Sequence, residues 1–115
     1  MSDSCLFCRI VAGELPSTVV YENDLVLAIR DINPVAPVHV LVLTKEHYDD
    51  IVDLGERSPE ASAALIEAVA SVAQIEQVAE PGFRTTFNTG VQGGQTVGHV
   101  HAHVIGRRQL SANLG

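Results

Sequence analysis

Three histidines separated by single apolar residues are the feature of this chain most suited to chemistry. His99, His101 and His103 stand in the run HVHAHVI. Alternation with a period of two is typical of a β-strand, in which residues i and i+2 share a face about 6.6 Å apart. A solvated strand face is the plain alternative, but function more often explains a row of groups that titrate near neutrality. We therefore expect a strand with three imidazoles on one face and with Val100 and Ala102 in the core behind them.

A glycine-rich segment, residues 88–98, directly precedes these histidines and contains four glycines. Glycines let a backbone approach a ligand closely, and loops of this kind often bind phosphate oxygens through their N–H groups. An ordinary flexible hairpin loop is the alternative. The position beside three candidate nucleophiles favours a phosphoryl-transfer site.

The two cysteines of the chain, Cys5 and Cys8, form a Cys-x-x-Cys pair near the N-terminus. In a reducing compartment such a pair is more often a metal or redox motif than a structural disulfide. A thioredoxin-like redox pair is disfavoured because the expected βαβ context is missing. Two buried thiols that bind nothing remain an alternative.

Length and charge limit the possible classes. The 115 residues, 46% of them hydrophobic, fit one domain, residues 1–115, with a core of its own. The net charge of −7 argues against broad binding to nucleic acid or to an anionic membrane. No apolar run approaches a membrane span, and the first residues lack a basic segment followed by an apolar one, so we expect a cytoplasmic protein.

The elements that must position these residues follow from the apolar periodicity. The predicted strands cover residues 18–22, 25–30, 39–44, 83–88 and 99–106. Short connections between the early strands favour antiparallel hairpins. We expect an α+β fold with a five-stranded antiparallel sheet, one long helix and a short N-terminal helix.

The two helices carry recognisable end signals. The short one is predicted over residues 5–12, before Gly13. The long one has Ser58 as its N-cap and Pro59 at its first position, with an apolar stripe at helical spacing from Ala61 to Ile75. We expect Pro81-Gly82 to stop this helix.

Taken together, these motifs resemble the histidine triad (HIT) family, whose signature matches His99-x-His101-x-His103. Further matches are CLFCRI (5–10), DINP (31–34), PVHVLV (37–42), Asn88 and GGQT (93–96). The resemblance covers nearly the whole chain and is closest to the nucleoside phosphoramidate hydrolases. It implies a homodimer with a five-stranded antiparallel sheet in each subunit.

The resemblance also implies a reaction at the α-phosphate of a purine nucleotide conjugate. His101 matches the nucleophile that forms a nucleotidyl-histidine intermediate, which water then hydrolyses. His103 and the backbone of the glycine-rich loop would stabilise phosphate charge, and His39 would orient the nucleophile. Thr96 would help to protonate the leaving group, and His99 completes the triad. This route requires no metal for catalysis.

A nucleotide pocket is implied in the same way. Asp31 matches the carboxylate that binds the ribose hydroxyls, although an ordinary turn aspartate is the alternative from the residue alone. The implied nucleotide-binding residues are Asp31, Ile32, Asn88, Gln95, Thr96, Val97, His103, Phe7, Ile10, Leu15 and Ile29. Plain core is the alternative for the apolar ones. Stacking and burial favour a purine, and we expect adenosine.

Some family members bind zinc, and by resemblance the ligands here would be Cys5, Cys8, His47 and His99. Four protein ligands close a tetrahedral site, so this zinc would be structural. Two competitors remain: a catalytic metal bound by the three triad histidines, and a nucleotide-binding regulatory or scaffold module with incidental hydrolysis.

The C-terminal segment departs from the family pattern. Arg107-Arg108 follows Gly106 where a second glycine is common, and the tail lacks an aromatic ending. The leaving group therefore stays open among an amine, a nucleotide, a sugar phosphate and an aminoacyl group.

Overall fold

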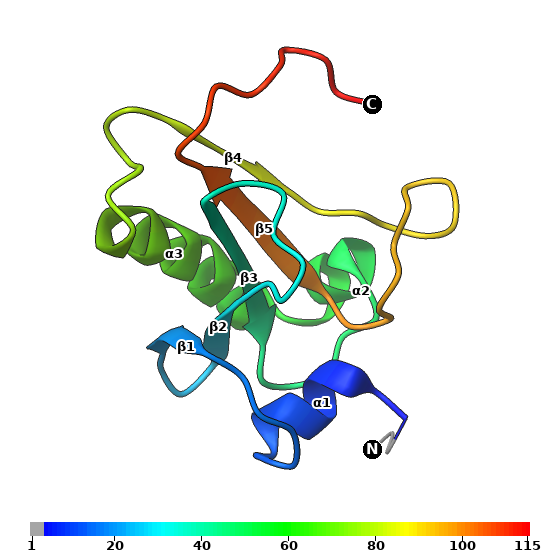
Figure 1. Cartoon of the computed structure of the whole chain (residues 1–115). Helices are drawn as coiled ribbons and strands as arrows, with labels where there is room; N and C mark the ends of the chain where they lie inside the picture. The colour runs from blue at the N-terminus through cyan, green and yellow to red at the C-terminus, as the bar shows by residue number, and fades with distance from the viewer. Residues whose placement is uncertain (1–3) are drawn as a thin grey trace.

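A five-stranded antiparallel sheet forms the centre of the molecule (Figure 1). The computed structural model describes residues 4–115. The strands are β1 (Val19–Glu22), β2 (Val26–Arg30), β3 (Val38–Thr44), β4 (Phe83–Thr86) and β5 (His101–Gly106), in the order β1-β2-β3-β5-β4. Every neighbouring pair is antiparallel, so the predicted fold class is confirmed.

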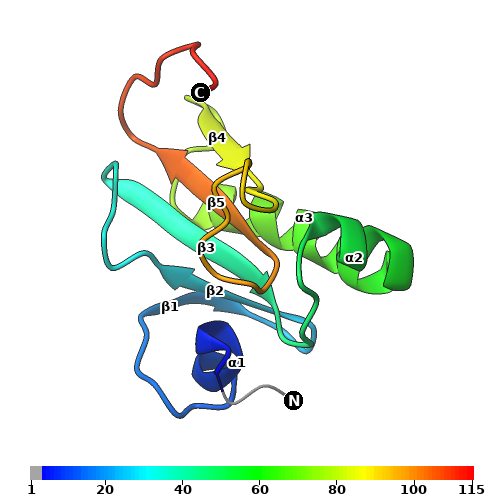
Figure 2. The same ribbon diagram turned by 90° about the vertical axis from the view of Figure 1, so that its right-hand side faces the viewer.

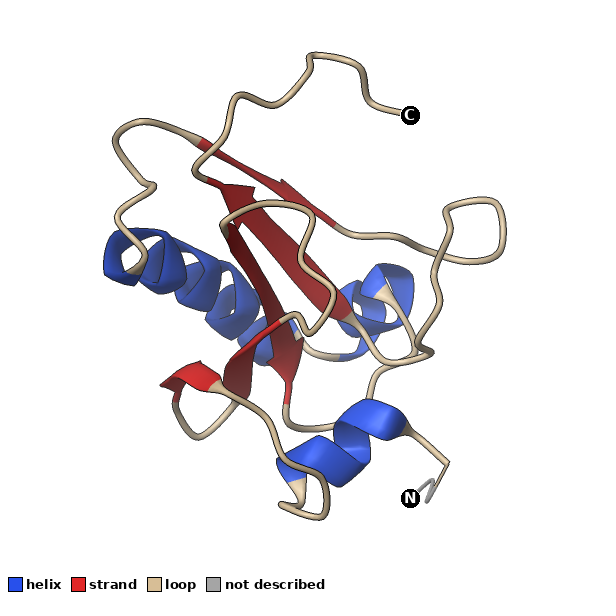
Figure 3. Ribbon diagram, in the orientation of Figure 1, coloured by secondary structure: helices blue, strands red, loops and turns tan. Residues whose placement is uncertain are grey.

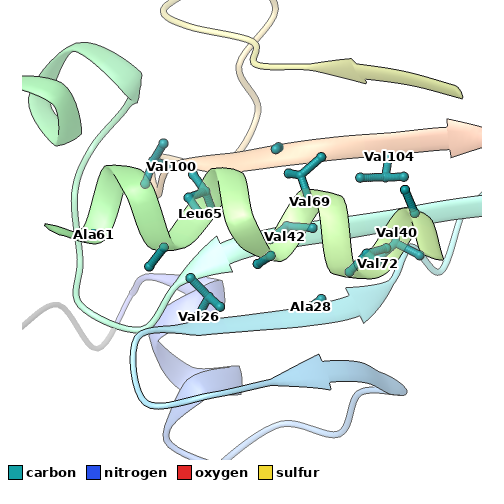
Figure 4. Close-up of a cluster of buried hydrophobic side chains, with 14 of the residues drawn as sticks. Val26, Ala28, Val40, Val42, Ala61, Leu65, Val69, Val72, Val100 and Val104 are labelled. Atoms are coloured by element: carbon teal, nitrogen blue, oxygen red, sulfur yellow. The ribbon is translucent and has the colours of Figure 1, made fainter. Parts of the chain in front are cut away.

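Helix α3 (Pro59–Ile75) covers one face of this sheet (Figures 2 and 3). Its start is as predicted, because the Ser58 hydroxyl accepts a hydrogen bond from the Ala61 N–H at 3.0 Å. The apolar stripe packs onto alternate residues of the central strands (Figure 4). The buried residues of this core include Val26, Ala28, Val40, Val42, Leu65, Ala68, Val69, Val72, Val100, Ala102 and Val104.

The predicted end of this helix is wrong, because α3 stops at Ile75 rather than at Pro81-Gly82. Gln77 takes a left-handed backbone conformation (φ 61°), and the Val78 N–H bonds back to the carbonyl of Ala73. This is a Schellman end, in which the C′ residue reverses the chain. The reversal carries Val78 into the core, where it is fully buried, while Ile75 remains 49% exposed.

A second short helix, α2 (Ile51–Arg57), was not predicted. It is only seven residues long and contains Gly55, so no extended apolar period marks it. Local polar contacts define it instead. The Asp50 carboxylate accepts from the Asp53 N–H at 2.9 Å, and Arg57 pairs with Asp53 at 2.7 Å.

The other face of the sheet is covered in part by α1 (Leu6–Val11), near the N-terminus. Phe7 packs there against Leu27, Ile29, Leu41 and Leu43. This smaller cluster leaves room for a cavity beside the histidines. Within residues 4–115, no helix is long and apolar enough to cross a membrane.

The ends of the last two strands also differ from the prediction. Strand β4 ends at Thr86 rather than at residue 88, and β5 begins at His101 rather than at His99. His99 therefore precedes the ladder, at the end of the glycine-rich segment. Of the three histidines in the run, His101 and His103 pair with β3, opposite Leu43 and Leu41, and His99 does not.

Candidate active site

A cavity of about 360 Å³ opens on the face of the sheet that carries α1. It is lined by Leu6, Phe7, Ile10, Leu15, Pro16, Ser17, Ile29, Arg30, Asp31, Ile32, Asn33, Leu41, Thr96, Val97, His101 and His103. Most of the predicted nucleotide and catalytic residues are thus brought together. Four of them, His39, Asn88, Gln95 and His99, do not line this cavity.

His101 is fixed in one tautomer by a backbone carbonyl. Its Nδ1 lies 2.8 Å from the carbonyl oxygen of His99, which can only accept, so Nδ1 carries the proton. Nε2 of the neutral ring then holds a lone pair. The Phe7 ring packs edge-on against this imidazole, with centroids 5.0 Å apart. The structure therefore holds the His101 ring in one orientation with its basic nitrogen at Nε2, an arrangement that a nucleophilic imidazole requires.

His39 is hydrogen-bonded directly to His103. The Val35 N–H donates to Nδ1 of His39 at 3.1 Å, so the proton of the neutral His39 ring is on Nε2. That Nε2 lies 2.9 Å from Nδ1 of His103 and donates to it. The direct partner of His39 is thus His103, and a role of His39 in orienting the nucleophile stays a prediction. The chain of donors leaves the His103 proton on Nε2.

Both of these rings are held neutral by burial. Desolvation lowers the pKa of His103 to about 4, with the nearby His101 and His39 rings adding to the effect. Desolvation also lowers the pKa of His39, opposed by Asp31, whose carboxylate lies 3.3 Å from Nε2. At neutral pH, His103 is therefore an uncharged N–H donor on the cavity wall.

The segment between β4 and β5 is shaped by its own side chains. The Gln95 amide donates to the carbonyls of Asp49 (2.8 Å) and Val97 (2.9 Å), and its oxygen accepts from the Gly90 N–H. Asn88 donates to the carbonyl of Gly93 at 2.8 Å. Both amides thus brace the loop, and a part for either in nucleotide binding stays a prediction.

Two backbone donors of this loop are available to a ligand. Among the described residues, the N–H groups of Thr96 and Val97 donate to no protein acceptor. Both residues line the cavity. Unpaired N–H groups beside a nucleophile can bind phosphate oxygens.

The cavity combines a carboxylate with apolar walls. Asp31 is partly buried, and its Oδ1 accepts from the Asn33 N–H at 2.8 Å in an Asx turn. Ile10, Leu15 and Ile29 line the same cavity. A carboxylate beside an apolar slot matches a nucleoside, which has two ribose hydroxyls and a flat base.

A second cluster brings together Cys5, Cys8, His47 and His99, as the resemblance implied. Their ligand atoms all lie within 4.8 Å of one another. Sγ of Cys5 is 3.4 Å from Nδ1 of His99, and Sγ of Cys8 is 3.3 Å from Nδ1 of His47. Burial, with Cys5 beside it, raises the pKa of the Cys8 thiol to about 11, so without a metal this sulfur is neutral.

The hydrogen-bond acceptors at the second nitrogens of His99 and His47 are those expected for metal ligands. Nε2 of His99 donates to the Thr44 carbonyl at 2.7 Å, which leaves Nδ1 free of a proton and facing the sulfurs. Nε2 of His47 lies 2.9 Å from the Asp49 carboxylate, so its Nδ1 is arranged in the same way. Metal-binding histidines usually donate their second N–H to a carbonyl or carboxylate. Two sulfurs and two imidazoles suit tetrahedral zinc.

A third set of residues, Asp31, His39 and His103, also has its ligand atoms within 4.8 Å. Here the hydrogen-bond partner of His39 is a donor, which prevents this ring from binding a metal. Because the Val35 N–H donates to Nδ1, the lone pair of His39 is already used, and Nε2 bears the proton. This set is therefore a hydrogen-bond network.

A catalytic metal shared by the three triad histidines also conflicts with the structure. His99 is fully buried, and its two nitrogens face Thr44 and the thiols. His101 uses Nδ1 on a carbonyl, and His103 uses Nδ1 on His39. The three rings thus serve three different partners.

Several cavity residues were missed because nothing in their type or spacing marked them. They are Leu6, Pro16, Ser17, Arg30, Asn33 and Leu41. Asp49 and Val35, which fix the tautomers of His47 and His39, were missed for the same reason. Leu6, inside CLFCRI, and Asn33, inside DINP, stood beside predicted site residues in recognised motifs, and Leu41 lies inside PVHVLV.

Comparison with known proteins supports this arrangement. The family model described as HIT domain matches residues 12–110. The chain is 38% identical over 114 residues to the purine nucleoside phosphoramidase of Escherichia coli K12, covering 99% of this chain and 96% of that protein. It is 43% identical over 108 residues to a 14 kDa zinc-binding protein of Brassica juncea, covering 92% and 95%.

Solved structures agree with the fold. A HIT family hydrolase from Clostridium thermocellum superposes with a TM-score of 0.94 at 40% sequence identity, and the match covers 99% of both chains.

Proposed function

Because this chain belongs to the HIT domain family, we propose that it is a hydrolase that cleaves purine nucleoside phosphoramidates at the α-phosphorus. The observation that carries the proposal is the tautomer of His101, which leaves a lone pair on Nε2 at the wall of a nucleoside-sized cavity. The name of the Escherichia coli relative supports the phosphoramidate class.

In the proposed reaction, Nε2 of His101 attacks phosphorus and the P–N bond breaks. The bonding electron pair leaves with the amine nitrogen, which takes a proton relayed from water by the Thr96 hydroxyl. Water then attacks the nucleotidyl-histidine, and the P–N bond breaks with its electron pair returning to Nε2 of His101. The proton that this water releases replaces the one taken from solvent in the first step. The products are a nucleoside monophosphate and a free amine.

Charge on the phosphate is proposed to be stabilised by neutral donors. The Nε2–H of His103 and the N–H groups of Thr96 and Val97 are the candidates. They are fixed before the substrate arrives, so little reorganisation is required in the transition state. Asp31 would accept from the ribose hydroxyls, and the apolar walls would enclose the purine, which we propose is adenine.

We also propose that Cys5, Cys8, His47 and His99 hold a structural zinc ion. Its chemistry would be cross-linking of α1 to the segment before β5, since four protein ligands leave no position for water. The zinc-binding relative from Brassica juncea supports this assignment. A homodimer remains part of the proposal and is tested by sedimentation.

The test is hydrolysis of adenosine 5′-phosphoramidate by the wild type and by His101→Ala, each with its metal content measured and each with and without a chelator. We expect turnover that survives chelation and falls at least about a thousandfold in a folded His101→Ala protein. No turnover by folded wild type would contradict the proposal and favour a binding role. Turnover abolished by chelation without unfolding would favour a catalytic metal instead.

A further inference from the structure

A second cavity, of about 590 Å³, adjoins the one described above. Leu6, Thr96 and Val97 line both cavities, so the two meet at the loop beside the catalytic histidines. The other residues that line it are Ser4, Cys5, His47, Asp49 and Gly98. The nucleoside, the nucleophile and the phosphate donors of the proposed reaction leave this space unused.

The position of this space suits the departing half of the substrate. In phosphoryl transfer the attacking and leaving atoms are roughly in line, so the bond that breaks points away from Nε2 of His101. The nucleoside of the proposed substrate occupies the first cavity with Asp31, so the other half of the substrate needs a separate space. A leaving group that passes Thr96, the residue proposed to relay its proton, enters the second cavity.

The charge of the second cavity is negative. Among the described residues that line it, Asp49 carries the one full charge, and no lysine or arginine is present. A divalent ion held by two thiolates and two neutral imidazoles would add no net charge beside it. A leaving group with a phosphate would therefore meet repulsion from Asp49, whereas an ammonium would be attracted.

We propose that this cavity is the leaving-group subsite and that Asp49 makes it select amines that bear a second, positively charged group. The proposal rests on the proposed function. It narrows the substrate class to phosphoramidates of cationic amines and disfavours nucleotide and sugar-phosphate leaving groups. Asp49 acts here on the substrate, in addition to its bond with His47.

Three adenosine 5′-phosphoramidates of matched length test it, with 1,2-diaminoethane, propylamine and β-alanine as leaving amines. The measured quantity is the ratio of kcat/KM between the cationic and the neutral substrate. This ratio cancels any general loss of activity that a change at the metal cluster might cause. We expect Asp49→Asn to lower the ratio about fivefold, as for an exposed ion pair. Asp49→Lys should shift the preference to the β-alanine substrate.

Asp24→Asn, an exposed acid in the turn between β1 and β2, is the matched control and should leave the ratio unchanged. A ratio that is the same in wild type and in both Asp49 variants overturns the inference, as does a wild-type preference for the anionic substrate. Turnover that persists without His101 would instead remove the proposed function itself, so the two failures are distinguishable.

Discussion

Each histidine of this protein is specialised by the single group that faces its second nitrogen. A carbonyl faces His101 and His99, which leaves each ring one basic nitrogen for other work. An N–H faces His39, which turns that ring into a donor towards His103. Identical side chains thus offer a lone pair to the cavity, a lone pair to the two thiols and a pair of donors.

These tautomers are directly measurable. In a long-range ¹H–¹⁵N spectrum at neutral pH we expect His101 to be protonated on Nδ1, and His39, His99 and His103 on Nε2. The His39→Phe variant removes the donor to His103 and should release that ring into a mixture of tautomers. A wild-type His101 protonated on Nε2 would contradict the assigned nucleophile.

Within the elements, α1 depends on contacts made far away in the sequence. It is only six residues long, too short to be stable alone, and its N-cap is the Cys5 sulfur, which accepts from the Cys8 N–H at 3.3 Å. The cysteines of this helix lie beside His47 and His99. A metal at this cluster would therefore hold the helix over the catalytic cavity.

We accordingly expect Cys5→Ser with Cys8→Ser to lower Tm by more than about 10 °C, since a structural zinc site contributes several kcal/mol to folding. Phosphoramidase activity at a temperature where the variant is folded should fall less than about threefold. Calorimetry and steady-state kinetics check the two effects. Lost turnover at unchanged Tm would argue against a structural role.

The loop between β4 and β5 depends on one close backbone approach. A Cβ at Gly93 would lie 2.2 Å from the carbonyl oxygen of Thr89, whereas a Cβ at Gly98 would meet nothing within 4 Å. Only the first glycine is therefore required by packing.

Gly93→Ala should displace the loop and lower kcat/KM at least about tenfold, because misplacing phosphate donors weakens transition-state binding. The change in Tm should be small, since the loop lies outside the core. Gly55→Ala, at an exposed position of α2 where a Cβ meets nothing within 4 Å, is the control and should cost far less activity. Equal losses in the two variants would show that loop position does not limit the reaction.

Across the whole molecule, the two faces of the sheet differ in the kind of side chain that they bury. The face under α3 is a continuous apolar core, while the other face buries His39, His99 and His101 beside a smaller cluster. Burying imidazoles disfavours their charged form, so the buried histidines on this face lower the free energy of unfolding in acid.

The acid dependence has a definite sign. The pKa of His103 is about 4 in the folded protein and near 6.5 when unfolded, so between these values the unfolded chain binds more protons. The free energy of unfolding should be constant above about pH 7 and fall as the pH drops from 6.5 to 4. The contribution of His103 is on the order of 3 kcal/mol at most.

Denaturant titrations of chelator-treated protein at several pH values measure this slope. His103→Gln cannot bind the proton and should show a shallower dependence over the same range. Equal slopes in the two proteins would contradict the burial argument for His103.

Local patterns in the sequence determined the strands, apart from the ends of the last two, and the start of α3, while the family resemblance implied the grouping of the two cysteines with two histidines. These depend on period, on end signals and on motifs, all of which act over a few residues. The end of α3 and the existence of α2 did not follow, because burial of Val78 and side-chain capping by Asp50 overrode the sequence signals.

Only the tertiary structure decided what each site residue does. The tautomers of three histidines are fixed by residues distant from them or unmarked in the sequence: His39 by Val35, His99 by Thr44 and His47 by Asp49. Nothing in the spacing of these partners predicts that role. The partner of His39 and the second cavity beside Thr96 likewise appear only when distant segments meet. A residue type sets which chemistry is possible, but the proton positions and neighbouring charges that select one chemistry come from contacts across the fold.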